Sequence, residues 1–197
     1  MKKSIMTDAT EYVVFDLEWN RPTTRYRAKN NGVKLNGEII QIGAIKLNQR
    51  LELIDQFDIY VKPQAYRKML KEITQITDIT NEVLEEGVAF QQAVKMFLEW
   101  CGEDFVFFSW SENDIIRLEE NMLYYDIAID DLPECYDIQY MFDDQITKDG
   151  RNFALSYAIW KLNIKPERAH SALNDAINTA AVMRFLDFSS GLAAYAV

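Results

Sequence analysis

The chain has 197 residues, of which 49% are hydrophobic and 13% aromatic, and it contains 7 glycines and 4 prolines. This composition is typical of a globular rather than a disordered protein and suits one domain that buries a sizeable core. The two cysteines, Cys101 and Cys135, are too few for a disulfide framework and lack the spacing of a metal knuckle. A reducing, cytoplasmic location is therefore expected.

The net charge of −10 argues against a general nucleic-acid coat protein, because phosphate binding normally needs a basic surface. The charge is uneven, since residues 1–75 hold 13 basic and 9 acidic side chains while the remainder hold 8 and 22. A protein that binds only the end of a strand needs no more than one local basic patch. Neither a signal peptide at the start nor a membrane span of ~18 apolar residues is expected.

The first part of the chain predicts three strands. Residues 12–17 form a short run rich in β-branched and aromatic side chains, which is typical of a buried strand. After a polar segment at 20–36, residues 38–47 and 51–61 predict two further strands, with a tight turn at 48–49 between them.

Helical periodicity begins near residue 70, and one apolar stripe runs from Ala93 to Trp100 before Gly102 ends the helix. Residues 105–109 are a second buried apolar run. The remaining chain has loops at Pro133 and 147–150 and predicts helices over 114–124, 153–162 and 171–188. Strands followed by helices interleaved with strands predict an α/β fold, with a mixed central sheet flanked by helices in a single domain over 1–197.

Two acids stand at the end of the first predicted strand. Asp16 and Glu18 are two residues apart, so strand alternation directs both side chains to the same face. Asp16 is the only charge in an otherwise apolar run, and burying a carboxylate without a partner is costly. For an isolated acid pair, a strand that simply ends at Asp16 is the better interpretation.

Two further acids lie on predicted helices. Asp114 fits a capping box with Ser111, but it shares a face with Leu118 and therefore lies on the buried side. Asp175 lies early in a helix that is apolar nearly all round, with neither Lys nor Arg within a turn of it. His170, the only histidine, precedes Asp175 by five residues, and a lone histidine is more often structural than catalytic.

Taken together, these signals leave several buried acids without basic partners, and divalent metal ions are the natural counter-charge. Oxygen ligands favour Mg²⁺ or Mn²⁺, which usually bind through a few carboxylates and substrate phosphate.

In combination, the motifs resemble those of the DEDDh exonuclease family, which includes RNase T, oligoribonuclease and the proofreading subunit of bacterial DNA polymerase. The matching segments are FDLEW with Asp16 and Glu18, SWSENDIIRLEEN with Asp114, and HSALNDAINTA with His170 and Asp175. The resemblance spans about residues 12–188 and is nearest to the Eri-type exonucleases, whose middle motif carries a tryptophan before the acid. The chain departs from the family pattern at Trp19, at Asn113 and in its longer 20–36 segment.

The resemblance implies an RNase H-like fold and a 3′→5′ exonuclease that releases nucleoside 5′-monophosphates from RNA or single-stranded DNA. Two ions, Mg²⁺ or Mn²⁺, would stabilise the attacking and leaving oxygens. By this resemblance Asp16, Glu18 and Asp175 hold the first ion, Asp16 is shared with the second, and Asp114 supports it through water. His170 is the candidate general base, because histidine is largely neutral near pH 7 and can accept a proton.

Substrate contacts are expected next to the acids. Trp19 suits stacking on the terminal base, and core packing is an equal alternative. Arg25 and Arg27, with Arg21, Lys29 and Lys34, suit a phosphate guide, whereas a solvated loop would need no role. Two other readings stay open: a catalytically weak nucleic-acid-binding module on the same fold, and a purely structural or partner-binding domain.

Overall fold

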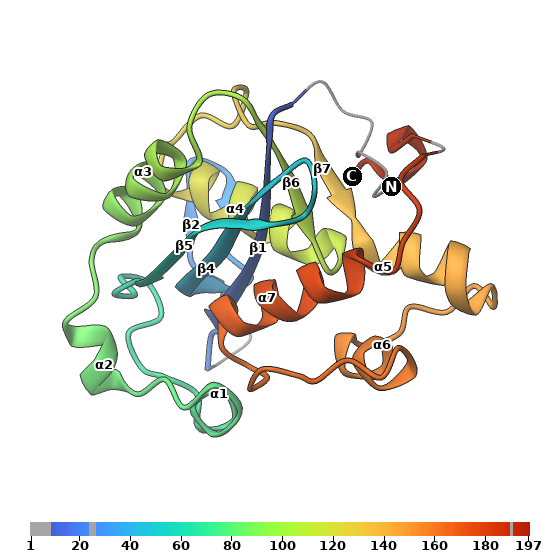
Figure 1. Cartoon of the computed structure of the whole chain (residues 1–197). Coiled ribbons are helices and arrows are strands. Elements are labelled where there is room, and N and C mark those ends of the chain that lie inside the picture. The colour runs from blue at the N-terminus through green and yellow to red at the C-terminus, as the bar shows by residue number, and fades with distance from the viewer. Residues whose placement is uncertain (1–8, 24–26, 190) are drawn as a thin grey trace.

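The computed structural model describes residues 9–23, 27–189 and 191–197. A mixed sheet with strand order β5-β4-β1-β6-β7 forms its centre, and helices cover both faces (Figure 1). Its strands are β1 (Glu11–Asn20), β4 (Glu38–Asn48), β5 (Leu53–Tyr60), β6 (Phe105–Ser109) and β7 (Cys135–Asp137). β1 pairs antiparallel with β4 and parallel with β6, so the mixed α/β fold expected from the sequence is confirmed.

The helices follow in chain order around this sheet. They are α1 (Lys71–Thr77), α2 (Asn81–Glu85), α3 (Phe90–Cys101), α4 (Glu112–Tyr124), α5 (Ile138–Phe142), a π-helical turn (Asp143–Thr147), α6 (Leu155–Lys161), α7 (Ala172–Met183) and a 3-10 turn (Ala193–Tyr195). A small hairpin of β2 (Lys29–Asn30) and β3 (Val33–Lys34) lies within the predicted polar segment. No helix in the described parts of the chain is long and apolar enough to cross a membrane.

β1 supplies side chains to both hydrophobic layers. Tyr12 and Val14 pack with α5, α6 and α7 on one face of the sheet. Val13, Phe15 and Leu17 pack with α3 and α4 on the other face. This alternation is the period of two that a strand buried on both faces requires.

Candidate active site

The strand alternation that builds the core also directs the first two acids. Asp16 and Glu18 continue the series of Tyr12 and Val14, so they project from the face that α7 covers. The β1–β4 register shifts between Glu18 and Trp19, directly after the second acid. The predicted common orientation of the two carboxylates therefore follows from the local backbone of β1.

Gly43 lets α7 approach this end of the sheet closely. It pairs with Asp16 across the β1–β4 ladder. A Cβ on Gly43 would lie 2.0 Å from the backbone nitrogen of Leu173 and 2.2 Å from the carbonyl carbon of Ala172. The start of α7 thus lies directly on β4, and the position needs glycine because the opposing atoms are backbone.

We expect Gly43→Ala to displace the start of α7, because two backbone segments cannot both remain in place around a new methyl group. The free energy of unfolding should fall by about 1–3 kcal/mol, as for other overpacked sites. The activity of the site should fall further, by up to ~10²-fold, since an ångström-scale displacement of an active-site element is enough for that loss. Thermal melts and initial rates measure the two effects.

Gly150→Ala is a matched control, because a Cβ at that exposed glycine meets nothing within 4 Å. Gly150 has a φ of +71°, so alanine there costs about 1 kcal/mol of backbone strain but should leave activity intact. Wild-type melting temperature and activity in Gly43→Ala would contradict the role given to Gly43.

Gln41 fixes the same helix by hydrogen bonding. Its side-chain oxygen accepts a hydrogen bond from the backbone N–H of Ala172 at 3.1 Å, and its side-chain nitrogen donates to Asp58 at 2.7 Å. Ser171, the N-cap residue of α7, makes no side-chain capping bond of its own. A residue of β4 therefore satisfies one of the first amides of α7, which otherwise lack partners.

Asp114 reaches the site from the start of α4. Its side chain is buried, and its Oδ1 accepts a hydrogen bond from the backbone N–H of Leu17 at 3.1 Å. Leu17 stands between Asp16 and Glu18, so this bond ties α4 to the acid-bearing end of β1. Ser111 is the N-cap of α4, as expected, but its hydroxyl accepts from the backbone N–H of Asn113 and not from that of Asp114, as the predicted capping box would require.

His170 and Asp175 meet at the start of α7. The backbone N–H of His170 donates to Oδ2 of Asp175 at 2.8 Å, and the exposed histidine has a φ of +61°. Glu18, His170 and Asp175 each offer a ligand atom, and these atoms all lie within 4.8 Å of one another. Residues 152 positions apart in the sequence are thus brought into one cluster.

Asn178 supports this cluster, and sequence analysis did not single it out. Its buried side-chain amide donates to the backbone oxygen of Glu167 at 3.3 Å and to Asp175 at 3.4 Å, and it accepts from the N–H of Glu167 at 2.9 Å. Asn178 therefore joins the loop that carries His170 to the helix that carries Asp175. The sequence signal that could have identified Asn178 is an amide three residues after Asp175 on a mostly apolar helix.

The electrostatic environment of the four acids is unfavourable to their charged forms. Burial, followed by repulsion from Asp114, Asp175 and Glu18, raises the pKa of Asp16 well above its usual value. Burial and the charges of Asp175 and Asp114 raise the pKa of Glu18 to about 8. Burial is also the main cause that raises the pKa of Asp114 to about 7 and that of Asp175 above its ordinary value.

This donor set fits a divalent metal ion. Carboxylate oxygens are the ligands that Mg²⁺ and Mn²⁺ prefer. A bound cation would favour the charged forms of the four acids, whose pKa values are raised by burial and, for Asp16, Glu18 and Asp114, also by repulsion between carboxylates. Among the described residues, Glu18, His170 and Asp175 form the group whose ligand atoms lie together. The expected ligand set of Asp16, Glu18 and Asp175, supported by Asp114, stays a prediction.

The residues expected to contact substrate occupy different surroundings. Trp19 packs against the core on the α3/α4 face, with the guanidinium of Arg117 5.3 Å from its ring centre and Gly37 against its ring. Arg27 is partly buried, and Arg25 lies outside the described residues. The stacking role of Trp19 and the phosphate-guiding role of the two arginines stay predictions.

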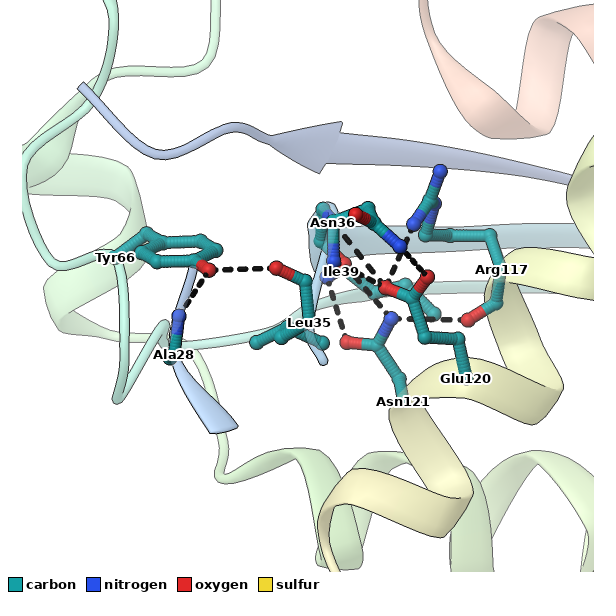
Figure 2. Close-up of polar contacts among 9 residues, drawn as sticks. Ala28, Leu35, Asn36, Ile39, Tyr66, Arg117, Glu120 and Asn121 are labelled. Carbon is teal, nitrogen blue, oxygen red and sulfur yellow. Dashed lines mark hydrogen bonds and ion pairs between the residues drawn. The ribbon is translucent and has the colours of Figure 1, made fainter. Parts of the chain in front are cut away.

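Hydrogen bonds hold the segment that carries Arg27 and the β2–β3 hairpin against the rest of the domain (Figure 2). The hydroxyl of Tyr66 donates to the backbone oxygen of Leu35 at 2.6 Å and accepts from the N–H of Ala28 at 2.9 Å. Asn121 on α4 accepts from the N–H of Ile39 at 3.1 Å. Three further basic side chains of this segment are exposed: Arg21, Lys29 and Lys34.

A mixed sheet whose central strand ends in an acid pair, completed by acids from two helices, defines an RNase H-like nuclease domain. The exonuclease family model of the RNase T type matches residues 13–183, and the chain belongs to this family, in its DEDDh branch. The family resemblance inferred from the motifs is thereby confirmed.

The sequence identity between the chain and individual relatives is low. The chain is 27% identical over 180 residues to the PolC-type DNA polymerase III of Clostridium perfringens, covering 89% of this chain and 11% of the polymerase. It is 25% identical over 113 residues to the probable 3′-5′ exonuclease KapD of Bacillus subtilis, covering 57% of this chain and 53% of KapD. The chain thus spans about a tenth of the polymerase and about half of KapD.

A solved structure has the same fold. The nuclease domain of 3′hExo, a DEDDh family member bound to rAMP, superposes with a TM-score of 0.76 at 19% identity, covering 91% of this chain and 92% of that domain. At this level of identity the likeness concerns the fold.

Proposed function

We propose that this chain is a metal-dependent 3′→5′ exonuclease that hydrolyses the terminal phosphodiester bond of RNA or single-stranded DNA and releases nucleoside 5′-monophosphates. One observation carries the proposal: four carboxylates with raised pKa values and a histidine, drawn from β1, α4 and the start of α7, converge on one site. The similarity to KapD, a probable 3′-5′ exonuclease, supports this direction of cleavage.

In this proposal each of the site residues has a separate role in catalysis. Asp16, Glu18, Asp114 and Asp175 would hold divalent ions, which would supply positive charge to stabilise the attacking and leaving oxygens. His170 accepts the proton of the attacking water, and its backbone bond to Asp175 keeps it beside the acids. Asp114 holds the end of β1 in place through its bond to Leu17. Gln41 and Gly43 keep α7, and therefore Asp175, against the sheet.

The direct test uses RNA and DNA oligomers labelled at the 5′ end, both single- and double-stranded, with Mg²⁺ or Mn²⁺. We expect the labelled strand to shorten one nucleotide at a time from its 3′ end, and chelation of the metal to stop the reaction. Internal cuts or loss of the labelled 5′ nucleotide would contradict the proposal. Binding of the oligomers without cleavage would favour the alternative of a catalytically weak nucleic-acid-binding module.

Metal binding should also be visible in the stability of the chain. An ion that binds only the folded state stabilises it by ~2.7 kcal/mol at a hundredfold excess over its dissociation constant. We therefore expect Mn²⁺ to raise the melting temperature, whereas NaCl at equal ionic strength should not. A melting temperature that is indifferent to Mn²⁺ would count against a metal site.

Both the stability of the metal-free chain and its increase on binding Mn²⁺ should depend on pH. Because the folded chain holds Glu18 at a pKa of about 8 and Asp114 at about 7, it binds more protons than the unfolded chain above about pH 4. Stability without metal should therefore fall as pH rises from about 4 to 8. Protons compete with metal for the same oxygens, so the rise caused by Mn²⁺ should be larger at pH 8 than at pH 5.5.

A further inference from the structure

A cavity of about 630 Å³ extends from the acids toward α6 and the loop that precedes α7. Asp16, His170 and Asp175 line one end of it. Its volume lies in the range of ~300–1,000 Å³ that is usual for small-molecule sites. The candidate active site therefore continues into a space large enough for more than the scissile phosphate.

Most of the cavity lining contributed by α6 and by the loop before α7 is apolar or aromatic. Trp110, Ile159, Trp160, Ile164 and Pro166 are among the lining residues, together with the polar Ser156, Asn163, Glu167 and Asn178, and no described lining residue is Lys or Arg. Such walls suit a flat, uncharged ring and offer no charged partner to a phosphate.

Trp160 is the most exposed of these side chains. It retains 72% of its accessible surface, although it lies on a helix whose other face enters the core. Its ring lies 5.6 Å from that of Tyr157, which stacks on Phe153 at 4.1 Å, so a short row of aromatic rings along α6 ends at the cavity. Trp110, by contrast, is buried and fixed by a hydrogen bond from its indole N–H to the backbone oxygen of Phe153.

We propose that this cavity binds the base of the terminal nucleotide, with Trp160 as the surface on which the base stacks. The inference rests on the proposed exonuclease function, which places the 5′-phosphate of that nucleotide at Asp16 and Asp175. The base of the same nucleotide then enters the apolar end of the cavity. Stacking on one aromatic face accepts every base, so sequence preference should be weak.

This assignment differs from the expectation that Trp19 stacks on the base. Trp19 lies against Arg117 and Gly37 and packs with the core on the α3/α4 face, whereas Trp160 lines the cavity that contains the acids. The two tryptophans can be separated by experiment, because they lie on different elements and in different surroundings.

The test compares AMP with ribose 5-phosphate, which lacks the base, by calorimetry in the presence of Mn²⁺. We expect wild-type protein to bind AMP more tightly by roughly 5- to 150-fold, the range that loss of one base–aromatic stack causes. Trp160→Ala should lose this preference, and Trp160→Phe should restore most of it. With oligomers, Trp160→Ala should raise KM by a similar factor and change kcat little.

Phe185→Ala removes another exposed aromatic side chain, 53% accessible, from outside the cavity and is the matched control. It should keep the wild-type preference for AMP. Retention of that preference in a folded Trp160→Ala protein would overturn the inference, and its loss in Trp19→Ala instead would place the base at Trp19. If wild-type protein released no mononucleotide from any oligomer, the proposed function itself would fail, whatever the binding results.

Discussion

Asp16→Asn is expected to nearly abolish release of mononucleotides. Asp16 stands at the centre of the acid cluster, where three other carboxylates act on its pKa. Asparagine keeps the shape of the side chain but removes the negative charge that holds the ions. The loss should exceed the ~10²–10³-fold that removal of one electrostatic contact typically causes. Glu18→Gln, Asp114→Asn and Asp175→Asn should have the same effect.

Stability separates this result from simple unfolding. Removing one of several mutually repelling carboxylates should leave the metal-free protein at least as stable as wild type. The stabilisation by Mn²⁺ should disappear in the same variant. Asp130→Asn, at an exposed acid, is the control and should match wild type in both measurements. Wild-type turnover by purified Asp16→Asn protein would show that the assignment of the site is wrong.

His170→Ala is expected to lower the rate by roughly 10²–10⁴-fold, the usual range for loss of a general base. Metal affinity should change little if His170 takes a proton and does not bind the ion. His170 also lies close enough to Glu18 and Asp175 to be a metal ligand. Calorimetric measurement of metal binding therefore distinguishes a general base from a ligand. Loss of metal binding in His170→Ala would assign it to the ligand set.

His170→Asn provides a matched variant. His170 has a φ of +61°, a backbone conformation that asparagine tolerates better than most residues. The loop should therefore keep its bond to Asp175 while the proton acceptor is absent. We expect His170→Asn to be as slow as His170→Ala, and near-normal turnover by it would show that His170 acts only by holding the loop.

Much of the site follows from local sequence patterns. The period of two in β1 predicted the shared orientation of Asp16 and Glu18. The apolar character of α7 predicted a buried Asp175, whereas Asp175 is only partly buried. The residues that position these acids were not predictable in this way. Gln41 and Ala172 are 131 residues apart, and only the folded chain brings them into contact.

Element boundaries were predicted less well than element types. The last helix was expected over 171–188 but ends at Met183, where turn hydrogen bonds from Phe185 and Leu186 replace the helical pattern. β7 and α5 were not predicted, because strands of three residues and helices of five carry little periodicity. The small hairpin within the polar segment was missed for the same reason.

The alternation along β1 also limits which genetic changes this domain can accept. Deletion of one residue between Tyr12 and Asp16 would shift the register of the rest of β1 by one residue. Every later side chain of the strand would then point to the opposite face of the sheet. Both carboxylates would then enter the aromatic layer around Phe97 and Phe107, and apolar side chains would face α7 in their place. The spacing within β1 is therefore constrained independently of the identity of its residues, whereas the 20–36 segment can change length without reversing either face.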